Sequence, residues 1–95
     1  MSDLVFEEGM KSLELYERAK KVIPGGVNSP VRAYDPYPFF VRKGKGSRIY
    51  DVDGRKYIDY VMGYGALFFG HAPSMLVEKL RKIVEDGVLY GAPTE

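Results

Sequence analysis

Hydrophobic positions along the chain follow a helical period near both ends and a strand period in between. In residues 11–23 and again in residues 74–86, apolar side chains recur at i, i+1, i+4, i+7 and i+8, which places them on one face of a helix. The two stripes comprise Leu15, Tyr16, Ala19, Val22 and Ile23, and Leu76, Val77, Leu80, Ile83 and Val84. Pro24 is expected to end the first helix and Gly87 the second, with Ser74 as the N-cap of the second.

Between the two predicted helices, residues 39–61 change to a period of two, which is typical of strands. Three runs are rich in β-branched and aromatic side chains: FFVRK, SRIYDV and RKYIDYV. Gly44-Lys45-Gly46 separates the first pair of runs, and Asp53-Gly54 separates the second. Because Asp-Gly between such runs favours a hairpin turn, the pattern predicts a three-stranded antiparallel meander. The predicted fold class is therefore an α+β segment with the order helix, loop, meander, helix.

Residues 24–38, which join the first helix to the meander, contain four prolines and two glycines. This spacing predicts neither a helix nor a strand. An irregular stretch of about 15 residues inside a compact domain is more often functional than idle. We therefore expect this stretch to carry a function.

Length, charge and cysteine count exclude several functional classes. The chain of 95 residues is one small domain at most, and its 14 basic and 13 acidic side chains leave a net charge of +1. This balance gives no electrostatic case for binding nucleic acid or an anionic membrane. There is no cysteine, and one histidine cannot form a metal cluster alone. No apolar run approaches the roughly 18 residues that span a bilayer, and residues 1–11 lack the order of a signal peptide, so we expect a cytoplasmic protein.

The stretch PGGVNSPVR, residues 24–32, ends on an arginine with the chemistry of an anion-binding group. The guanidinium of Arg32 is always charged, and its planar fork matches a carboxylate through two parallel hydrogen bonds. Ser29, three residues earlier, can add a hydroxyl donor to the same anion. A solvated loop arginine is the alternative that spacing alone leaves open.

Three other features carry weaker signals. His71 has the chemistry of a general base, but a structural histidine at a junction between loop and helix is the simpler interpretation. Tyr64, between two glycines, suits stacking on a planar ligand, and half-buried packing is its alternative. The sequence DVDG at residues 51–54 lacks the remaining ligands of a calcium loop and predicts a turn. Because no nucleophile–base pair is visible, the residues by themselves predict no catalytic set.

Three stretches carry a family resemblance: LYERAKKVIPGGVNSPVRA, GKGSRIYDVDGRKYIDYVMGYGALFFGH and YGAPTE. Together they resemble the N-terminal segment of the glutamate-1-semialdehyde 2,1-aminomutases, class III aminotransferases of pyridoxal-phosphate fold type I. The resemblance runs from about Leu13 to Glu95. PGGVNSPVRA is its specific part, whereas the pattern around DVDG is shared by class III aminotransferases generally. Residues 1–95 are thus expected to be the N-terminal segment of a larger enzyme.

The resemblance also implies an activity and site residues. The full-length enzyme would convert glutamate 1-semialdehyde to 5-aminolevulinate in tetrapyrrole (porphyrin) biosynthesis, with pyridoxal 5'-phosphate and pyridoxamine 5'-phosphate as cofactor. Arg32 would hold the substrate carboxylate in a loop at residues 24–38, Ser29 would assist, and Tyr64 would lie beside the substrate, where many relatives carry tryptophan. The cofactor lysine and most phosphate contacts would lie downstream, so the 95 residues alone are expected to be inactive. The enzyme would be a homodimer.

Two other interpretations stay open at this point. Another class III aminotransferase would act on a different amino acid and take its amine from an external donor. A small non-catalytic interaction module would fold cooperatively by itself, whereas exposed apolar surface favours a segment of a larger protein. The eight tyrosines and five phenylalanines are many for so small a core and favour docking onto further protein.

Overall fold

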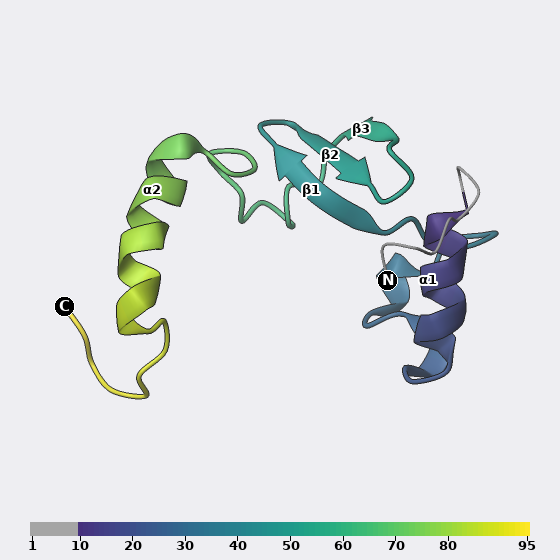
Figure 1. The fold of residues 1–95 in the computed structure, drawn as a ribbon, viewed down its shortest axis with the longest axis horizontal. Helices are drawn as coiled ribbons and strands as arrows, with labels where there is room; N and C mark the ends of the chain where they lie inside the picture. The colour runs from purple at the N-terminus through teal and green to yellow at the C-terminus, as the bar shows by residue number, and fades with distance from the viewer. Residues whose placement is uncertain (1–9) are drawn as a thin grey trace.

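The computed structural model describes residues 10–95, which form helices at both ends of a small sheet. In chain order the elements are α1 (Lys11–Lys20), η1 (Pro24–Gly26), η2 (Pro30–Arg32), β1 (Val41–Lys45), β2 (Arg48–Asp51), β3 (Lys56–Ile58), α2 (Ser74–Ile83) and η3 (Val84–Asp86), where η marks a short 3₁₀ helix. The strands form one antiparallel sheet in the order β1-β2-β3, with α1 beside it and α2 at the far end (Figure 1). The predicted order of helix, loop, antiparallel meander and helix is confirmed.

Helix α1 ends at Lys20, three residues earlier than the apolar stripe predicted. Ile23 is extended, with φ −126° and ψ 124°, because a residue that precedes proline is disfavoured in the helical region. Gly26 then reverses the chain with φ 75°, and a Cβ atom at this position would lie 2.6 Å from a carbon of the Tyr16 ring. Only glycine fits so close to the ring, so the chain after α1 packs directly back onto the helix.

A side chain from the turn between β2 and β3 caps the first turn of α1. The backbone amides of Lys11 and Ser12 donate to the two carboxylate oxygens of Asp53, at 2.7 and 3.1 Å. The hydroxyl of Ser12, which is 1% exposed, accepts a hydrogen bond from the amide of Phe40 at 2.9 Å. A carboxylate in this place satisfies amides that have no partner within the helix and complements the helix dipole. Helix α1 is therefore tied both to the β2–β3 turn and to the entry of β1.

Strand β1 runs further than the sequence predicted. Gly44 pairs with Ile49, so this glycine lies inside the strand and the reversal falls at Gly46 and Ser47. The prediction that Gly44-Lys45-Gly46 separates the strands is therefore wrong for two residues, because Gly44 and Lys45 belong to β1. The physical reason is backbone geometry, because Gly46 has the positive φ of 58° that the turn requires. A bulge also interrupts the register of β1 between Val41 and Lys43.

The turn between β2 and β3 is built around Asp51, which is 2% exposed. Its carboxylate accepts hydrogen bonds from the amides of Asp53 and Arg55 and from the hydroxyl of Tyr57, at 2.9, 2.8 and 2.7 Å. The DVDG sequence thus forms the predicted turn, with both carboxylates bonded inside the protein. Burial raises the pKa of the Tyr57 hydroxyl, and its hydrogen bond to Asp51 adds to the shift.

Two single turns of 3₁₀ helix, η1 and η2, interrupt the stretch that was predicted to be irregular. Each begins at a proline, whose fixed φ suits the first position of a helical turn. The rest of residues 24–38 is irregular and includes a cis bond between Asp35 and Pro36. The prediction of no helix was therefore wrong for the six residues of η1 and η2.

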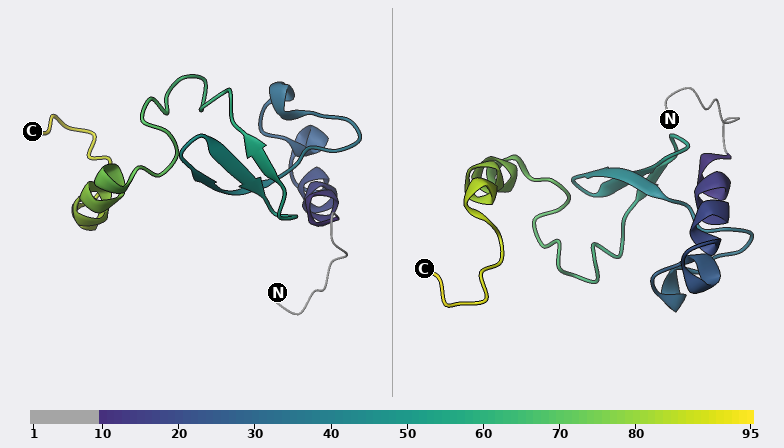
Figure 2. Two further views of the ribbon diagram at one scale, coloured as in Figure 1. Left: turned by 90° about the horizontal axis from the view of Figure 1, so that it is seen from above. Right: turned by 60° about the horizontal axis from the view of Figure 1, so that its bottom comes forward.

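Helix α2 stands apart from the sheet and from α1, and the connection before it crosses the open space between them (Figures 1 and 2). Its N-cap is Pro73, without a side-chain hydrogen bond, and Ser74 is already the first helical residue. The expected Ser74 cap is therefore wrong. The helix ends at Ile83 and η3 continues it, until Gly87, with φ 96°, ends the helical stretch.

Residues 10–95 enclose no fully buried apolar side chain. Their Cα radius of gyration is 16.6 Å, whereas a compact domain of this length has one of about 12 Å. Large apolar side chains of the loop before α2, of α2 and of the stretch after η3 lie exposed, among them Phe68, Phe69, Leu80, Ile83, Val88 and Leu89. None of the helices described is long and apolar enough to cross a membrane. The expectation about a signal peptide rests largely on residues 1–9, which lie outside the described part.

Candidate functional site

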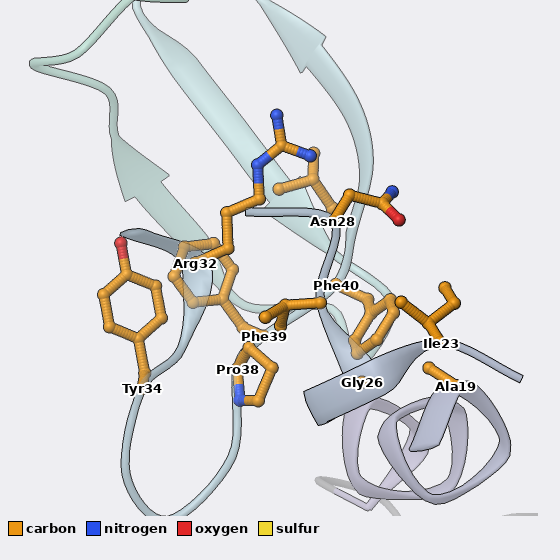
Figure 3. Close-up of a pocket in the computed structure, with 11 residues that line it drawn as sticks. Ala19, Ile23, Gly26, Asn28, Arg32, Tyr34, Pro38, Phe39 and Phe40 are labelled. Carbon is orange, nitrogen blue, oxygen red and sulfur yellow. The ribbon is translucent and has the colours of Figure 1, made fainter. Parts of the chain in front are cut away.

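A groove of about 430 Å³ lies between α1, the stretch after it and the start of β1. The lining residues come from all three: Ala19, Ile23, Gly26, Val27, Asn28, Arg32, Tyr34, Pro38, Phe39, Phe40 and Val41. Most of them are apolar, and Arg32 is the one charged side chain among them (Figure 3). An apolar wall with few polar groups is the usual lining of a small-molecule site.

Arg32 owes its place to η2. Its backbone amide donates to the carbonyl of Ser29 at 2.9 Å, and the amide of Ala33 donates to the carbonyl of Pro30 at 3.1 Å. Within residues 10–95 the guanidinium forms no ion pair, so its charge has no internal counter-ion there. The side chain is exposed, and in the close-up it extends past the ring of Phe39, with the guanidinium beyond the side chains of Pro38 and Phe39 (Figure 3). A cation in this setting is available to the carboxylate of a ligand.

Asn28 is a site residue that the sequence analysis missed. It lines the groove, and its amide lies on the same side of the apolar wall as the Arg32 guanidinium (Figure 3). An asparagine amide offers two N–H donors and one acceptor. The signal was present in PGGVNSPVR, where Asn28 is the only side-chain amide, but in a segment rich in turns an asparagine is usually explained by backbone conformation.

Stacked aromatic rings hold the wall beneath Arg32. The Tyr34 and Phe39 rings are parallel within 5°, with centroids 6.0 Å apart, and Phe39 stacks on Tyr57 with centroids 4.7 Å apart. The hydroxyl of Tyr57 donates to the buried carboxylate of Asp51. The stack therefore connects the segment after η2 to the sheet, and it limits how far that segment can shift.

Ser29 lies next to the groove rather than in its lining. It is half-buried and extended, with φ −150° and ψ 139°, immediately before η2. The turn brings its carbonyl to the Arg32 amide, so the two predicted substrate residues belong to one rigid turn. Whether its hydroxyl assists Arg32 stays a prediction.

Tyr64 lies on a different segment, between β3 and α2, and is not among the residues that line the groove. Its side chain is 76% exposed and its φ is 60°, a conformation that is rare outside glycine. Within residues 10–95 the structure therefore brings Ser29 and Arg32 together and leaves Tyr64 apart from them. Its half-buried alternative does not describe this exposed side chain.

His71 is paired with a carboxylate. Its Nε2 atom lies 2.6 Å from Oδ2 of Asp59, and its backbone forms an isolated antiparallel bridge with Gly46. These contacts fit a structural histidine, the simpler of the two interpretations in the sequence analysis, and because a carboxylate partner also suits a general base, that interpretation stays a prediction. Residues 10–95 contain no group of three His, Asp or Glu side chains arranged to hold a metal ion.

The groove as a whole has the chemistry to bind a small molecule with an apolar body and a carboxylate. It does not fit a pyridoxal cofactor, which is held through a lysine, because no lysine lines it. Residues 10–95 thus present a candidate substrate-binding surface, and none of the described residues that line it is a lysine.

Residues 30–93 match the family model described as aminotransferase class-III. The chain is 58% identical over 85 residues to the glutamate-1-semialdehyde 2,1-aminomutase of Methanosphaera stadtmanae. The aligned region covers 90% of this chain and 20% of that protein. A solved omega-transaminase from Sphaerobacter thermophilus superposes with a TM-score of 0.82 at 38% identity, over 94% of this chain and 20% of that one.

A glutamate-1-semialdehyde aminomutase from Pseudomonas aeruginosa has a TM-score of 0.76 at 23% identity, over 93% of this chain and 20% of that one, which shows a shared fold. A variant of that enzyme has been solved in complex with PMP. The chain described here spans about a fifth of the length of the relatives it matches.

Proposed function

The chain belongs to the class III aminotransferase family, and from this membership we propose that it is the N-terminal part of a glutamate-1-semialdehyde 2,1-aminomutase. The full-length protein would convert glutamate 1-semialdehyde to 5-aminolevulinate by moving an amino group within the molecule, a step of tetrapyrrole synthesis. The identity of 58% to an aminomutase supports this choice within the family.

One observation in the structure carries the proposal: the guanidinium of Arg32, which has no ion-pair partner among residues 10–95, above an apolar wall. Glutamate 1-semialdehyde is a short chain with a carboxylate at one end, and a fork of two N–H donors fits that end. In this proposal Arg32 binds the carboxylate, Ser29 assists it, and Tyr64 reaches the substrate from the segment before α2.

Pyridoxal 5'-phosphate and its pyridoxamine form are the cofactor that we infer, because the family and the PMP complex of a structural relative imply it. When bound, the cofactor supplies the amine exchange. The groove residues would not hold it, since none of the described residues that line the groove is a lysine. They would instead fix the distance between the substrate carboxylate and the reacting carbons.

The exposed apolar side chains of α2 and the connection before it support contact with further protein. We propose that the rest of the enzyme and a second subunit cover them, in a homodimer located in the cytoplasm. Tyrosine and phenylalanine side chains, which the chain has in number, suit such interfaces.

A second candidate function is supported by the omega-transaminase, which shares 38% identity and the fold. A transaminase of that kind would need an external amino donor. The purified full-length protein, loaded with pyridoxamine 5'-phosphate, should therefore be given glutamate 1-semialdehyde alone. Repeated turnover to 5-aminolevulinate without any added donor is the expected result. Turnover only in the presence of an added amine, with release of a keto acid, would refute the aminomutase assignment in favour of a transaminase.

A further inference from the structure

Residues 60–70, between β3 and α2, form a loop that carries Tyr64 and that we call the Tyr64 loop. Its base is closed by the two residues that flank it, Asp59 and His71. Oδ2 of Asp59 and Nε2 of His71 lie 2.6 Å apart. The two side chains are only 10% and 18% exposed, respectively, so the pair is largely shielded from water.

The backbone fixes both ends of the Tyr64 loop to the same place in the sheet. The amide of Asp59 donates to the carbonyl of Ser47 at 2.8 Å. The amide of His71 donates to the carbonyl of Gly46 at 2.8 Å, and the amide of Gly46 returns a bond to the carbonyl of His71 at 2.9 Å. Both ends therefore lie on the β1–β2 turn, and the side-chain pair joins them above it.

The other carboxylate oxygen of Asp59 organises the start of the loop. Oδ1 accepts hydrogen bonds from the amides of Val61 and Met62, at 2.9 and 3.0 Å. The bond from Met62 and then the bond from His71 hold the pKa of Asp59 below its ordinary value, so the carboxylate is ionised at neutral pH. One side chain thus bonds to both ends of the loop.

The loop that this pair closes has a strained backbone. Met62 and Tyr64 inside it have φ of 51° and 60°, and Ala72, next to His71, has φ of 49°; these are the only non-glycine residues among residues 10–95 with positive φ. Such conformations persist where the surrounding structure over-determines them, and they cluster at functional sites. Tyr64 is 76% exposed, so its own burial does not offset the strain. Bonds inside the loop hold part of this conformation, among them those from the amides of Gly65 and Leu67 to the carbonyls of Val61 and Met62, at 3.2 and 3.0 Å, and the pair at the base holds the two ends of the loop together.

The geometry points to Asp59 and His71 as positioning residues that hold the Tyr64 loop in its strained conformation and thereby place Tyr64 for substrate binding. The holding role stands on the contacts alone, whereas the effect on substrate rests on the proposed function. In this role His71 acts as a hydrogen-bond donor to Asp59, and proton abstraction from substrate is not its task.

The test compares two substitutions of His71 in the full-length enzyme loaded with cofactor. His71→Gln keeps an N–H donor near the place of Nε2, whereas His71→Leu keeps much of the volume and removes the donor. His71→Leu and Asp59→Ala are expected to lower kcat/KM by about tenfold to a hundredfold, the effect of a misplaced binding group. His71→Gln is expected to stay close to the wild-type value.

Hydrogen exchange of the backbone amides supplies a readout that does not depend on activity. Exchange within residues 60–70 should accelerate in His71→Leu and Asp59→Ala and stay unchanged in His71→Gln. Glu85→Gln, which removes an exposed carboxylate of η3, is the control and should match the wild type in both measurements. In a Tyr64→Ala background, His71→Leu should lower kcat/KM no further, because the pair acts through Tyr64.

Two outcomes would overturn the inference. Unchanged exchange of the loop in both His71→Leu and Asp59→Ala would show that the pair does not hold it. Loss of activity in His71→Gln with unchanged exchange would show that His71 itself reacts. Failure of the proposed function can be told apart from failure of this inference. A wild-type enzyme without aminomutase activity would refute the proposed function, while hydrogen exchange in the variants would still test whether the pair holds the loop.

Discussion

The imidazole of His71 lies so close to Gly44 that a Cβ atom at residue 44 would come within 2.6 Å of its Cγ atom. Gly44 is inside β1 and pairs with Ile49, so the strand presents a flat surface to the ring at this point. The absence of a side chain there lets the base of the Tyr64 loop approach the sheet.

The variant Gly44→Ala tests this contact. Because the clash is with a ring that is itself held by Asp59, we expect a loss of roughly 1–3 kcal/mol in the free energy of unfolding of the full-length protein. In a His71→Ala background the ring is gone, and the same substitution should cost much less. Denaturant unfolding of the four proteins measures this coupling; strictly additive costs would show that the two residues do not constrain each other.

A second prediction concerns Asp53, which bonds to the Lys11 and Ser12 amides across more than forty residues of sequence. Asp53→Ala leaves these amides without their acceptor, so the expected loss in the free energy of unfolding is about 1 kcal/mol, the cost of losing a helix cap. The matched control is Asp86→Ala, which removes an exposed carboxylate of η3. Equal unfolding midpoints for the two variants would contradict the capping role.

The pH dependence of stability follows from two carboxylates. Burial alone would raise the pKa of Asp53, but its bonds to the Lys11 and Ser12 amides outweigh burial and hold the pKa below 3.8; the pKa of Asp59 is also lowered. The folded state therefore favours both ionised forms. Their stabilisation is fully present above the unfolded pKa and is lost as pH falls through the lower, folded pKa.

The corresponding measurement is the free energy of unfolding of the full-length protein between about pH 6 and about pH 3. The upper limit lies about two units above the usual pKa of a carboxyl group, and the lower limit lies about one unit below it. Stability should fall across this range, and the fall should be smaller in Asp53→Asn, which has no carboxylate at this position to protonate. A variant whose stability falls as steeply as that of the wild type would show that the Asp53 bonds contribute nothing to the acid sensitivity.

The order of the elements was predictable from the sequence because it depends on local period. The stripes around Leu15 and Leu80 predict helices, and Asp53-Gly54 predicts a hairpin, whatever surrounds them. Their ends were less predictable. Strand β1 continues through Gly44 to the turn at Gly46, and the glycine at residue 44 leaves room for a distant histidine ring, a contact that no local pattern records.

The candidate site likewise has features that were predictable from the sequence and features that were not. Arg32 stood out because a lone cation in a stretch full of turns has few structural uses, and its turn is local in sequence. The roles of Asp53 and Asp59 did not stand out, because each carboxylate bonds to groups that are distant along the chain: the α1 amides and His71. Asn28 was missed since its position beside the guanidinium depends on how η1 and η2 orient the segment between them.

The sharpest prediction for the proposed function is Arg32→Lys in the full-length enzyme. Lysine keeps the charge but loses the planar fork, so the carboxylate loses one of two parallel hydrogen bonds. A hydrogen bond to a charged group contributes about 1.5–3 kcal/mol, so kcat/KM should fall by roughly tenfold to a hundredfold.

Arg18→Lys, the same substitution at an exposed position of α1 outside the groove, is the control and should leave kcat/KM unchanged. Which of the two kinetic constants changes, KM or kcat, is informative as well. If Arg32 binds the carboxylate equally in the ground state and the transition state, KM rises and kcat holds; if it also aligns the reacting carbons, kcat falls with it. An Arg32→Lys enzyme with the kcat/KM of the wild type would remove the guanidinium from the site, and with it the structural observation on which the proposed function rests.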